Sequence, residues 1–407
     1  MTPGPFPSTE SHDMTNRLPP ELEEATRLTR AGKLAEATAL IQRLLRGGRP
    51  GAAPEPASTG SPTVIDVEPI TVDAPAPQPE AAFTGRLHAK PRTGLGETLR
   101  GLAARAMPAG LDLGLGDIPR PAPDPVPDGA SFVTASYTNA AGTRDYKLYI
   151  PKNRTGRPLP LIVMLHGCTQ SPDDFAAGTR MNVLAEEHGC FVAYPAQPSS
   201  ANAQKCWNWF NPDDQQRDRG EPSLIAGITR QIMRDHPVDQ SRVYIAGLSA
   251  GGAAAAVMGA AYPDLYAAIG VHSGLPSGAV RNLPSAFAAM REGTAGGKGT
   301  RTVPTIVFHG DQDTTVHPRN GDAVIAQSRA GAADLRATVQ RGQVPGGHAY
   351  SRTIHTAPSG RTLCEQWTIH GAGHAWAGGS PSGSYTDPQG PDATREMLRF
   401  FLQHRHA

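Results

Sequence analysis

The pentapeptide GLSAG at residues 247–251 constrains this chain more than any other segment. An apolar run at 242–246 precedes it, and a run of small residues at 252–258 follows it. A strand, a serine between glycines and a closely packed helix form the sharp turn that exposes a nucleophilic serine at the edge of an α/β sheet. Glycine is needed on both sides because a side chain there would collide with the strand or the helix. The segment predicts an exposed Ser249 hydroxyl; the alternative is an ordinary Gly/Ser turn in another α/β protein.

Short apolar runs and helical stretches alternate along residues 129–407, which we interpret as one catalytic domain. The expected strands are a hairpin at 131–137 and 145–150, and then runs at 159–165, 190–194, 243–246, 267–271, 303–308 and 363–369. The expected helices are 175–187, 224–235 and 252–262. Buried strands that alternate with helices predict a mainly parallel sheet covered by helices on both faces. Ligands of such sheets bind beyond the carboxyl ends of the strands.

The first third of the chain has a different composition. Residues 1–20 are interpreted as a disordered tail, and residues 21–46 as a helical segment suited to docking on a granule or to self-association. Residues 47–128 are rich in Pro, Gly and Ala and are interpreted as a linker with a short helix near 93–106.

Charge and cysteine content exclude several classes of function. The 38 Lys and Arg residues balance the 37 Asp and Glu residues, so no basic surplus points to a nucleic-acid partner. The four cysteines are too few for a disulfide scaffold and have no C-x-x-C metal spacing. The sequence has neither a secretory signal pattern nor a run long enough to span a membrane, so a cytoplasmic location is expected.

A serine nucleophile needs a base, and the base needs a carboxylate behind it. An α/β-hydrolase supplies them in the order Ser, Asp or Glu, His. Two aspartates follow the expected strand at 303–308: Asp313, further out on the loop, is favoured, and Asp311 is the alternative because it could instead cap the turn. His374, after a Gly-Ala-Gly loop, is favoured as the base over His370, which is expected to be structural.

The developing oxyanion needs hydrogen-bond donors. One should be the backbone N–H of Ala250, which follows the nucleophile. The second should come from the loop after the strand at 159–165, with the N–H of Cys168 as the candidate and that of Thr169 as the alternative. His166 and His309 are expected to shape loops by hydrogen bonding.

An aromatic cluster, CWNWF at residues 206–210, stands out in a chain with only 6% aromatic residues. Either it fills the core, or Trp207, Asn208 and Trp209 form one wall of the acyl pocket, with Trp376 opposite. Cys168 and Cys206 could approach one another there. A disulfide between them is possible, but a reducing cytoplasm argues against a persistent one.

Together these segments make the chain resemble the polyhydroxybutyrate depolymerase-type esterases, relatives of feruloyl and acetylxylan esterases with the α/β-hydrolase fold. The resemblance covers roughly residues 130–405 and rests on LHGCTQ at 165–170, CWNWF at 206–210, GLSAGG at 247–252, HGDQD at 309–313, GHAW at 373–376 and the closing helix at 392–401. It implies a serine carboxylesterase that acts on short 3-hydroxyacyl esters or on poly(3-hydroxybutyrate) and its oligomers, with Ser249, Asp313 and His374 as the triad and no metal or cofactor.

Two other functions remain open at this point. The same chemistry could serve a feruloyl or acetylxylan ester, because the sequence offers no reliable discriminator of the substrate. Alternatively, the protein could be a scaffold or a granule-associated protein with an inert hydrolase domain, although a complete set of triad residues argues against that.

Overall fold

The computed structural model describes residues 122–152, 156–294, 303–330, 332 and 334–406. The expected tail at 1–20, the helical segment at 21–46 and nearly all of the 47–128 linker lie outside the described residues. None of the described helices combines the length and apolar character that a membrane crossing requires.

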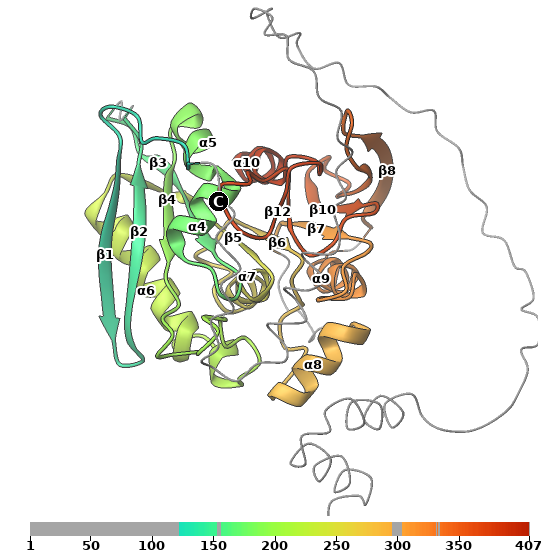
Figure 1. Cartoon of the computed structure of the whole chain (residues 1–407), viewed down its shortest axis with the longest axis horizontal. Coiled ribbons are helices and arrows are strands. Elements are labelled where there is room, and N and C mark those ends of the chain that lie inside the picture. Colours follow the sequence, from blue (N-terminus) through green and yellow to red (C-terminus); the bar gives the residue numbers. More distant parts are fainter. Residues whose placement is uncertain (1–121, 153–155, 295–302, 331, 333, 407) are drawn as a thin grey trace, which may run out of the picture. The chain divides into compact units, whose positions relative to one another are not determined.

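A ten-stranded sheet organises the described residues (Figure 1). Its strands are β1 Ser131–Asn139, β2 Gly142–Ile150, β3 Leu159–Leu165, β4 Phe191–Pro195, β5 Val238–Leu248, β6 Ala268–His272, β7 Thr305–Gly310, β8 Arg336–Gln343, β9 Ala349–Thr356 and β10 Thr362–Ile369. Their order across the sheet is β1-β2-β4-β3-β5-β6-β7-β10-β9-β8. The six strands from β4 to β10 run parallel, and the hairpins β1–β2 and β8–β9 add antiparallel strands at the two edges. A separate pair, β11 Trp376–Ala377 and β12 Thr386–Asp387, is also parallel.

Helices cover both faces of this sheet. The described helices are α4 Pro172–Thr179, α5 Met181–His188, the short η1 Asp213–Gln215, α6 Gly220–Asp235, α7 Ala250–Ala261, α8 Leu283–Glu292, α9 Arg319–Arg329 and α10 Ala393–Leu402. In Figure 1, α5 and α10 lie on one side of the sheet and α6 and α7 on the other. The mainly parallel, two-sided α/β-hydrolase architecture expected from the sequence is therefore confirmed.

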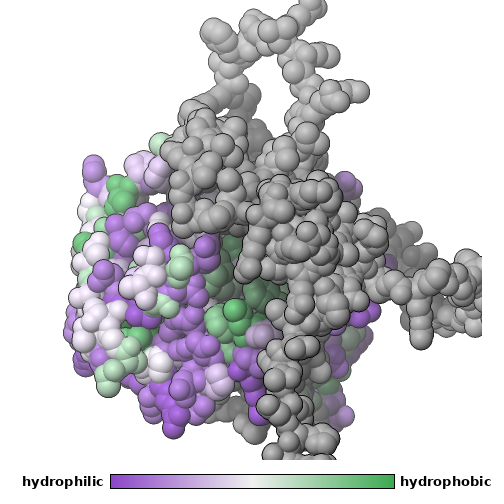
Figure 2. All heavy atoms as spheres, turned by 60° about the horizontal axis from the view of Figure 1, so that its bottom comes forward, coloured by the Kyte–Doolittle hydropathy of each residue, from purple (hydrophilic) through white to green (hydrophobic). Residues whose placement is uncertain are grey.

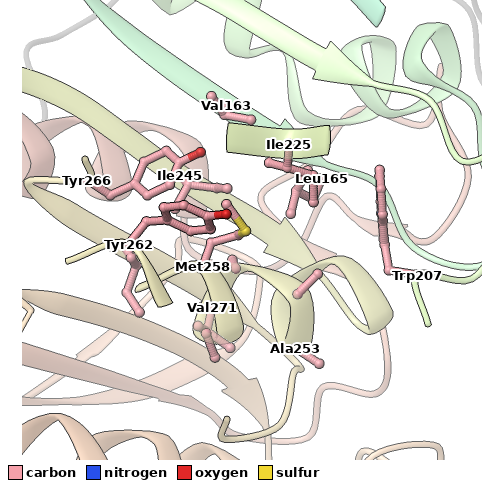
Figure 3. Close-up of a cluster of buried hydrophobic side chains, with 14 of the residues drawn as sticks. Val163, Leu165, Trp207, Ile225, Ile245, Ala253, Met258, Tyr262, Tyr266 and Val271 are labelled. Carbon is pink, nitrogen blue, oxygen red and sulfur yellow. The ribbon is translucent and has the colours of Figure 1, made fainter. Parts of the chain in front are cut away.

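Each central strand contributes to two hydrophobic cores because successive side chains point to opposite faces of the sheet. In β3, Val163 and Leu165 join the core under α6 and α7, while Ile162 and Met164 join the core under α5 and α10. Figure 3 shows the first core, in which Val163 and Leu165 belong to the same cluster of buried side chains as Met258 of α7. All seven residues of β3 are buried, as expected for a strand covered on both faces.

One expected element differs from the structure. The helix predicted at 175–187 is two helices, α4 and α5, because Arg180 between them adopts a left-handed backbone with φ 54°.

The coloured part of the surface in Figure 2 is mostly polar, and hydrophobic residues form small groups on it.

Candidate active site

The turn between β5 and α7 holds Ser249 in a strained conformation, with φ 58° and ψ −118°. L residues rarely adopt such a backbone, and residues that do gather at functional sites. A side chain at either flanking glycine would meet backbone. A Cβ on Gly247 would lie 2.3 Å from the carbonyl carbon of Gly251, and a Cβ on Gly251 would lie 2.1 Å from the Leu165 oxygen. The glycines are therefore required for the steric reason inferred from the sequence.

His374 and Asp313 form a partly buried pair beyond the ends of β10 and β7. The His374 Nδ1 atom lies 2.7 Å from the Asp313 Oδ2 atom. Asp313 Oδ1 accepts hydrogen bonds from the Thr315 and Val316 N–H groups. Burial opposes ionisation of Asp313, but hydrogen bonds from His309 and His374 outweigh it, so the pKa of this carboxyl is well below its usual range. The carboxylate is thus charged at neutral pH and orients the His374 ring.

His272, at the end of β6, connects the serine turn to the histidine loop. Its carbonyl oxygen accepts a hydrogen bond from the Ser249 N–H at 2.9 Å. Its Nε2 atom accepts one from the N–H of Ala377, three residues after His374, at 3.0 Å. Burial, followed by the nearby His309 and His374 rings, lowers the pKa of His272 well below its usual value, so the ring remains a neutral acceptor. The two loops that carry the serine and the base are therefore fastened to the same buried residue.

The competing pair, Asp311 and His370, forms a separate contact. Asp311 Oδ2 lies 2.9 Å from His370 Nδ1, and Asp311 Oδ1 accepts the Gly371 N–H. Each aspartate thus has its own histidine. Asp313 is buried and His374 half-buried, whereas the side chains of Asp311 and His370 are 33% and 43% exposed.

The turn after β3 lies beside the serine, since a Cβ placed on Gly167 would be 3.7 Å from the Ser249 Cβ. Three of its N–H groups are occupied. That of Gly167 donates to the Gln170 side chain, that of Thr169 to the Gln204 carbonyl and that of Gln170 to the Gly167 carbonyl. Among the described residues, the Cys168 N–H has no such acceptor. This favours Cys168 over the alternative, Thr169, as an oxyanion donor beside Ala250, whose N–H opens the first turn of α7.

Cys168 is bonded to Cys206 in a disulfide. The structure thus contains the disulfide that the sequence left open. The bond excludes the Cys168 thiol as a nucleophile. It also ties the turn at residues 166–170, which carries the candidate oxyanion donor and is called the oxyanion turn below, to the aromatic segment at 206–210.

Buried hydrogen bonds hold the oxyanion turn from behind. His166 Nδ1 donates to the Gly167 carbonyl, and His166 Nε2 accepts the Gln197 N–H. Burial lowers the pKa of His166 to about 4, so the ring is neutral and this tautomer is available. The Gln197 side chain in turn donates to the Glu221 carboxylate and to the Cys206 carbonyl. His166 shapes its loop by hydrogen bonding, as expected.

Of the two alternatives that the sequence left open for the tryptophans, burial favours the core over the pocket wall. Trp207 and Trp376 are fully buried, and Trp209 is nearly so. The Trp207 indole N–H donates to the His166 carbonyl, and that of Trp376 donates to the Thr394 hydroxyl. Asn208 donates from its backbone and its side chain to Glu221. The Trp207 and Trp376 indoles support the site from within, because their N–H groups are paired inside the protein.

Tyr385 is an exposed aromatic residue beside the turn after β3 that sequence reasoning missed. It is 49% exposed, and its hydroxyl lies 3.2 Å from the Thr169 hydroxyl in the oxyanion turn. Its carbonyl accepts the N–H of Trp376, two residues beyond His374. Tyr385 therefore connects the oxyanion turn to the histidine loop. Its Ser/Gly-rich surroundings carry no pattern that would have singled it out.

No group of three or more His, Cys, Asp or Glu residues suited to a metal ion occurs in the described part of the chain. The groups gathered at the site are a serine hydroxyl, an imidazole, a carboxylate and backbone N–H donors.

Residues 144–342 match the protein family described as "Esterase PHB depolymerase". Poly(3-hydroxyalkanoate) depolymerase C of Paucimonas lemoignei is 34% identical over 231 residues, 53% of this chain and 54% of that protein. Feruloyl esterase B of Thermothelomyces thermophilus is 30% identical over 201 residues, 44% of this chain and 67% of that protein. A probable acetylxylan esterase A of Neosartorya fischeri is 29% identical over 209 residues, 46% of this chain and 55% of that protein. The chain thus spans about half the length of the first of these relatives.

Among solved structures, the acetyl xylan esterase from Aspergillus awamori matches with a TM-score of 0.51 and 19% identity. The match covers 67% of this chain and 99% of that one. At this identity the likeness concerns the fold.

Proposed function

Because the chain belongs to the family of esterases related to polyhydroxybutyrate depolymerases, we propose that it hydrolyses short 3-hydroxyacyl esters, in particular oligomers of 3-hydroxybutyrate, through an acyl-enzyme on Ser249. The observation that carries the proposal is the strained Ser249 turn, fastened through His272 to the loop that holds the His374–Asp313 pair. This arrangement supplies a nucleophile, a base and an orienting carboxylate.

In the proposed reaction His374 acts twice. Asp313 keeps the proton on His374 Nδ1, which leaves Nε2 free to take the Ser249 proton as Oγ attacks the ester carbonyl. The Ala250 and Cys168 N–H groups stabilise the oxyanion. The C–O bond then breaks, and the alcohol leaves with the proton from His374. Water repeats the sequence on the acyl-enzyme and releases the acid.

The substrate class is supported by similarity of sequence. The relative with 34% identity carries the name of a poly(3-hydroxyalkanoate) depolymerase, and those at 29–30% are named for acetylxylan and feruloyl esters. A feruloyl ester is the second candidate, since the chain covers 67% of feruloyl esterase B.

Comparison of kcat/KM for a 3-hydroxybutyrate dimer and trimer, methyl ferulate and an acetylated xylo-oligosaccharide tests this proposal. We expect the hydroxybutyrate trimer to be preferred at least tenfold. A preference for methyl ferulate would overturn the substrate assignment and leave the esterase mechanism intact. Full turnover by Ser249→Ala on every ester would overturn the mechanism itself.

A further inference from the structure

A second serine–histidine–aspartate chain lies near the proposed triad and is separate from it. The Ser351 hydroxyl lies 2.9 Å from His370 Nε2, and His370 Nδ1 lies 2.9 Å from Asp311 Oδ2. Ser351 belongs to β9, whereas Asp311 and His370 directly follow β7 and β10. We propose that Ser351 is a second, slower nucleophile that accepts acyl groups from small esters with good leaving groups.

The hydrogen bonds set the direction of proton transfer. Asp311 Oδ1 accepts the Gly371 N–H at 2.8 Å, which fixes the orientation of the carboxylate. Burial opposes ionisation of Asp311, but the His370 and Gly371 hydrogen bonds lower the pKa of its carboxyl, so it is charged at neutral pH. The carboxylate keeps the proton on His370 Nδ1. Nε2 is then the acceptor and the Ser351 hydroxyl the donor, which is the polarity needed to activate an alcohol.

Holding the histidine loop does not by itself account for this arrangement. Asp311 already bonds the Gly371 N–H and the His370 ring on the loop. The bond from His370 to Ser351 extends away from that contact and joins a side chain of a different strand. Ser351 is partly exposed, and the His370 side chain is 43% exposed. A small substrate can therefore reach the hydroxyl from solvent.

Arg341, on the neighbouring strand β8, is paired with Ser351. The β8–β9 register pairs Ser351 directly with Arg341, and directly opposed residues of antiparallel strands share one face of the sheet. Arg341 is exposed. In the proposed reaction the Arg341 guanidinium balances negative charge on an acyl oxygen at Ser351, the role that backbone N–H groups serve at Ser249.

The reaction is a balanced acyl transfer. The Ser351 Oγ atom bonds to the carbonyl carbon of an aryl ester, and its proton passes to His370 Nε2. The bond from that carbon to the aryl oxygen breaks, and the phenol leaves with the proton from His370. Water then attacks the acyl-serine and releases the carboxylic acid. Ser351 lies within a strand and has no helix N-terminus beside it, so two backbone oxyanion donors are lost, each worth about 10²–10³ in rate. We expect acylation about 10⁴-fold or more slower than at Ser249.

Removal of the first nucleophile makes the second one measurable. The full chain carrying Ser249→Ala is incubated with a fluorophosphonate, which releases fluoride on reaction with an activated serine, and the adduct is mapped by peptide mass spectrometry. We expect one adduct, on Ser351, and slow release of nitrophenol from p-nitrophenyl acetate. Adding Ser351→Ala should abolish the adduct, and adding His370→Gln should lower its rate at least tenfold.

Thr353→Ala in the Ser249→Ala background is the matched control. Thr353 lies two residues further along β9 on the same face, so this variant should keep the Ser351 adduct. The absence of a Ser351 adduct in the folded Ser249→Ala protein would overturn the proposal, as would an adduct that forms equally fast with His370→Gln. The site would then only hold the histidine loop. The outcome is independent of the proposed function because the readout is the Ser351 peptide in a protein that lacks Ser249.

Discussion

At the scale of single residues, the site contains two aspartate–histidine pairs that follow the same two strands, β7 and β10. Asp313 and His374 are the more buried pair, and Asp311 and His370 the more exposed one. His374 of the first pair lies three residues before Ala377, whose N–H donates to His272, and the His272 carbonyl accepts the Ser249 N–H. Burial strengthens the electrostatic support that a carboxylate gives to an imidazolium. The two pairs therefore should differ sharply in their effect on catalysis.

Asn substitution at the two aspartates tests this difference. Asp313→Asn keeps the shape but no longer fixes the His374 tautomer, and we expect kcat/KM on a short nitrophenyl ester to fall about 10⁴-fold. Asp311→Asn should lower it less than about tenfold. A larger loss with Asp311→Asn would reassign the triad.

Sequence reasoning named Asp313 and His374 from chain order and loop position, which are local properties. It could not decide what the tryptophans do, because burial depends on packing between distant segments. Trp376, for instance, is covered by Phe175, 201 positions earlier in the chain, at 5.4 Å between ring centroids. Tyr385 was missed for the same reason, since its contact with Thr169 spans 216 positions.

At the scale of elements, prediction succeeded where a pattern of burial is written into the sequence. β3 has the predicted bounds because its apolar run is covered on both faces. The β8–β9 hairpin was missed because β8 is largely exposed, β9 is mostly half-buried and both are rich in polar residues, so neither shows an apolar face. The break between α4 and α5 was missed because a left-handed arginine leaves no signal of the kind that glycine leaves.

The close approach of α7 to β3 makes Gly251 irreplaceable. Alanine is ordinarily the better helix former. Here its Cβ would lie 2.1 Å from the Leu165 oxygen, which is backbone and cannot yield easily. We expect Gly251→Ala to lower the free energy of unfolding by more than about 3 kcal/mol, measured by urea denaturation.

Gly373→Ala is the control for that experiment. A Cβ on Gly373 would meet nothing within 4 Å, and the residue precedes His374 directly. The urea midpoint of the Gly373→Ala variant should stay close to that of the wild type. Equal midpoints for the two variants would contradict the steric account of the turn.

The disulfide joins the oxyanion turn to the segment that follows β4. It closes a loop with a sequence separation of 38, which corresponds to up to about 4 kcal/mol from loss of chain entropy in the unfolded state. The double variant Cys168→Ser/Cys206→Ser should therefore unfold at lower urea concentration and lose kcat, since the Cys168 N–H is less firmly placed. Unchanged kcat in the folded double variant would remove the disulfide from the account of the oxyanion turn.

At the scale of the whole molecule, the pKa values of two buried groups are shifted in opposite directions, so their contributions to stability depend on pH with opposite signs. Burial lowers the pKa of His166 to about 4, so acidification from pH 6.5 toward 4 favours the unfolded chain, which binds the extra proton. Burial and then the Asp214 charge raise the pKa of Glu221 to about 7, so acidification from pH 7 toward 4.5 favours the folded protein. Each contribution is roughly 3 kcal/mol at most, so they largely offset one another.

Glu221→Gln should make the contribution of His166 to the pH dependence of the free energy of unfolding measurable. Without the opposing carboxyl, the free energy of unfolding should fall more steeply between pH 6.5 and 4.5 than in the wild type. Urea unfolding at four pH values measures the slopes, and Glu187→Gln on α5, where the side chain is 49% exposed, is the control. Parallel curves for Glu221→Gln and the wild type would contradict this assignment.

The most direct test of the account is to trap the acyl-enzyme. Acid quenching within the first turnover on p-nitrophenyl acetate, followed by peptide mass mapping, should find one acetyl group on Ser249. His374→Gln should prevent its formation on that timescale. An acetyl group on any other residue during the first turnover, with Ser249 unmodified, would contradict the central claim.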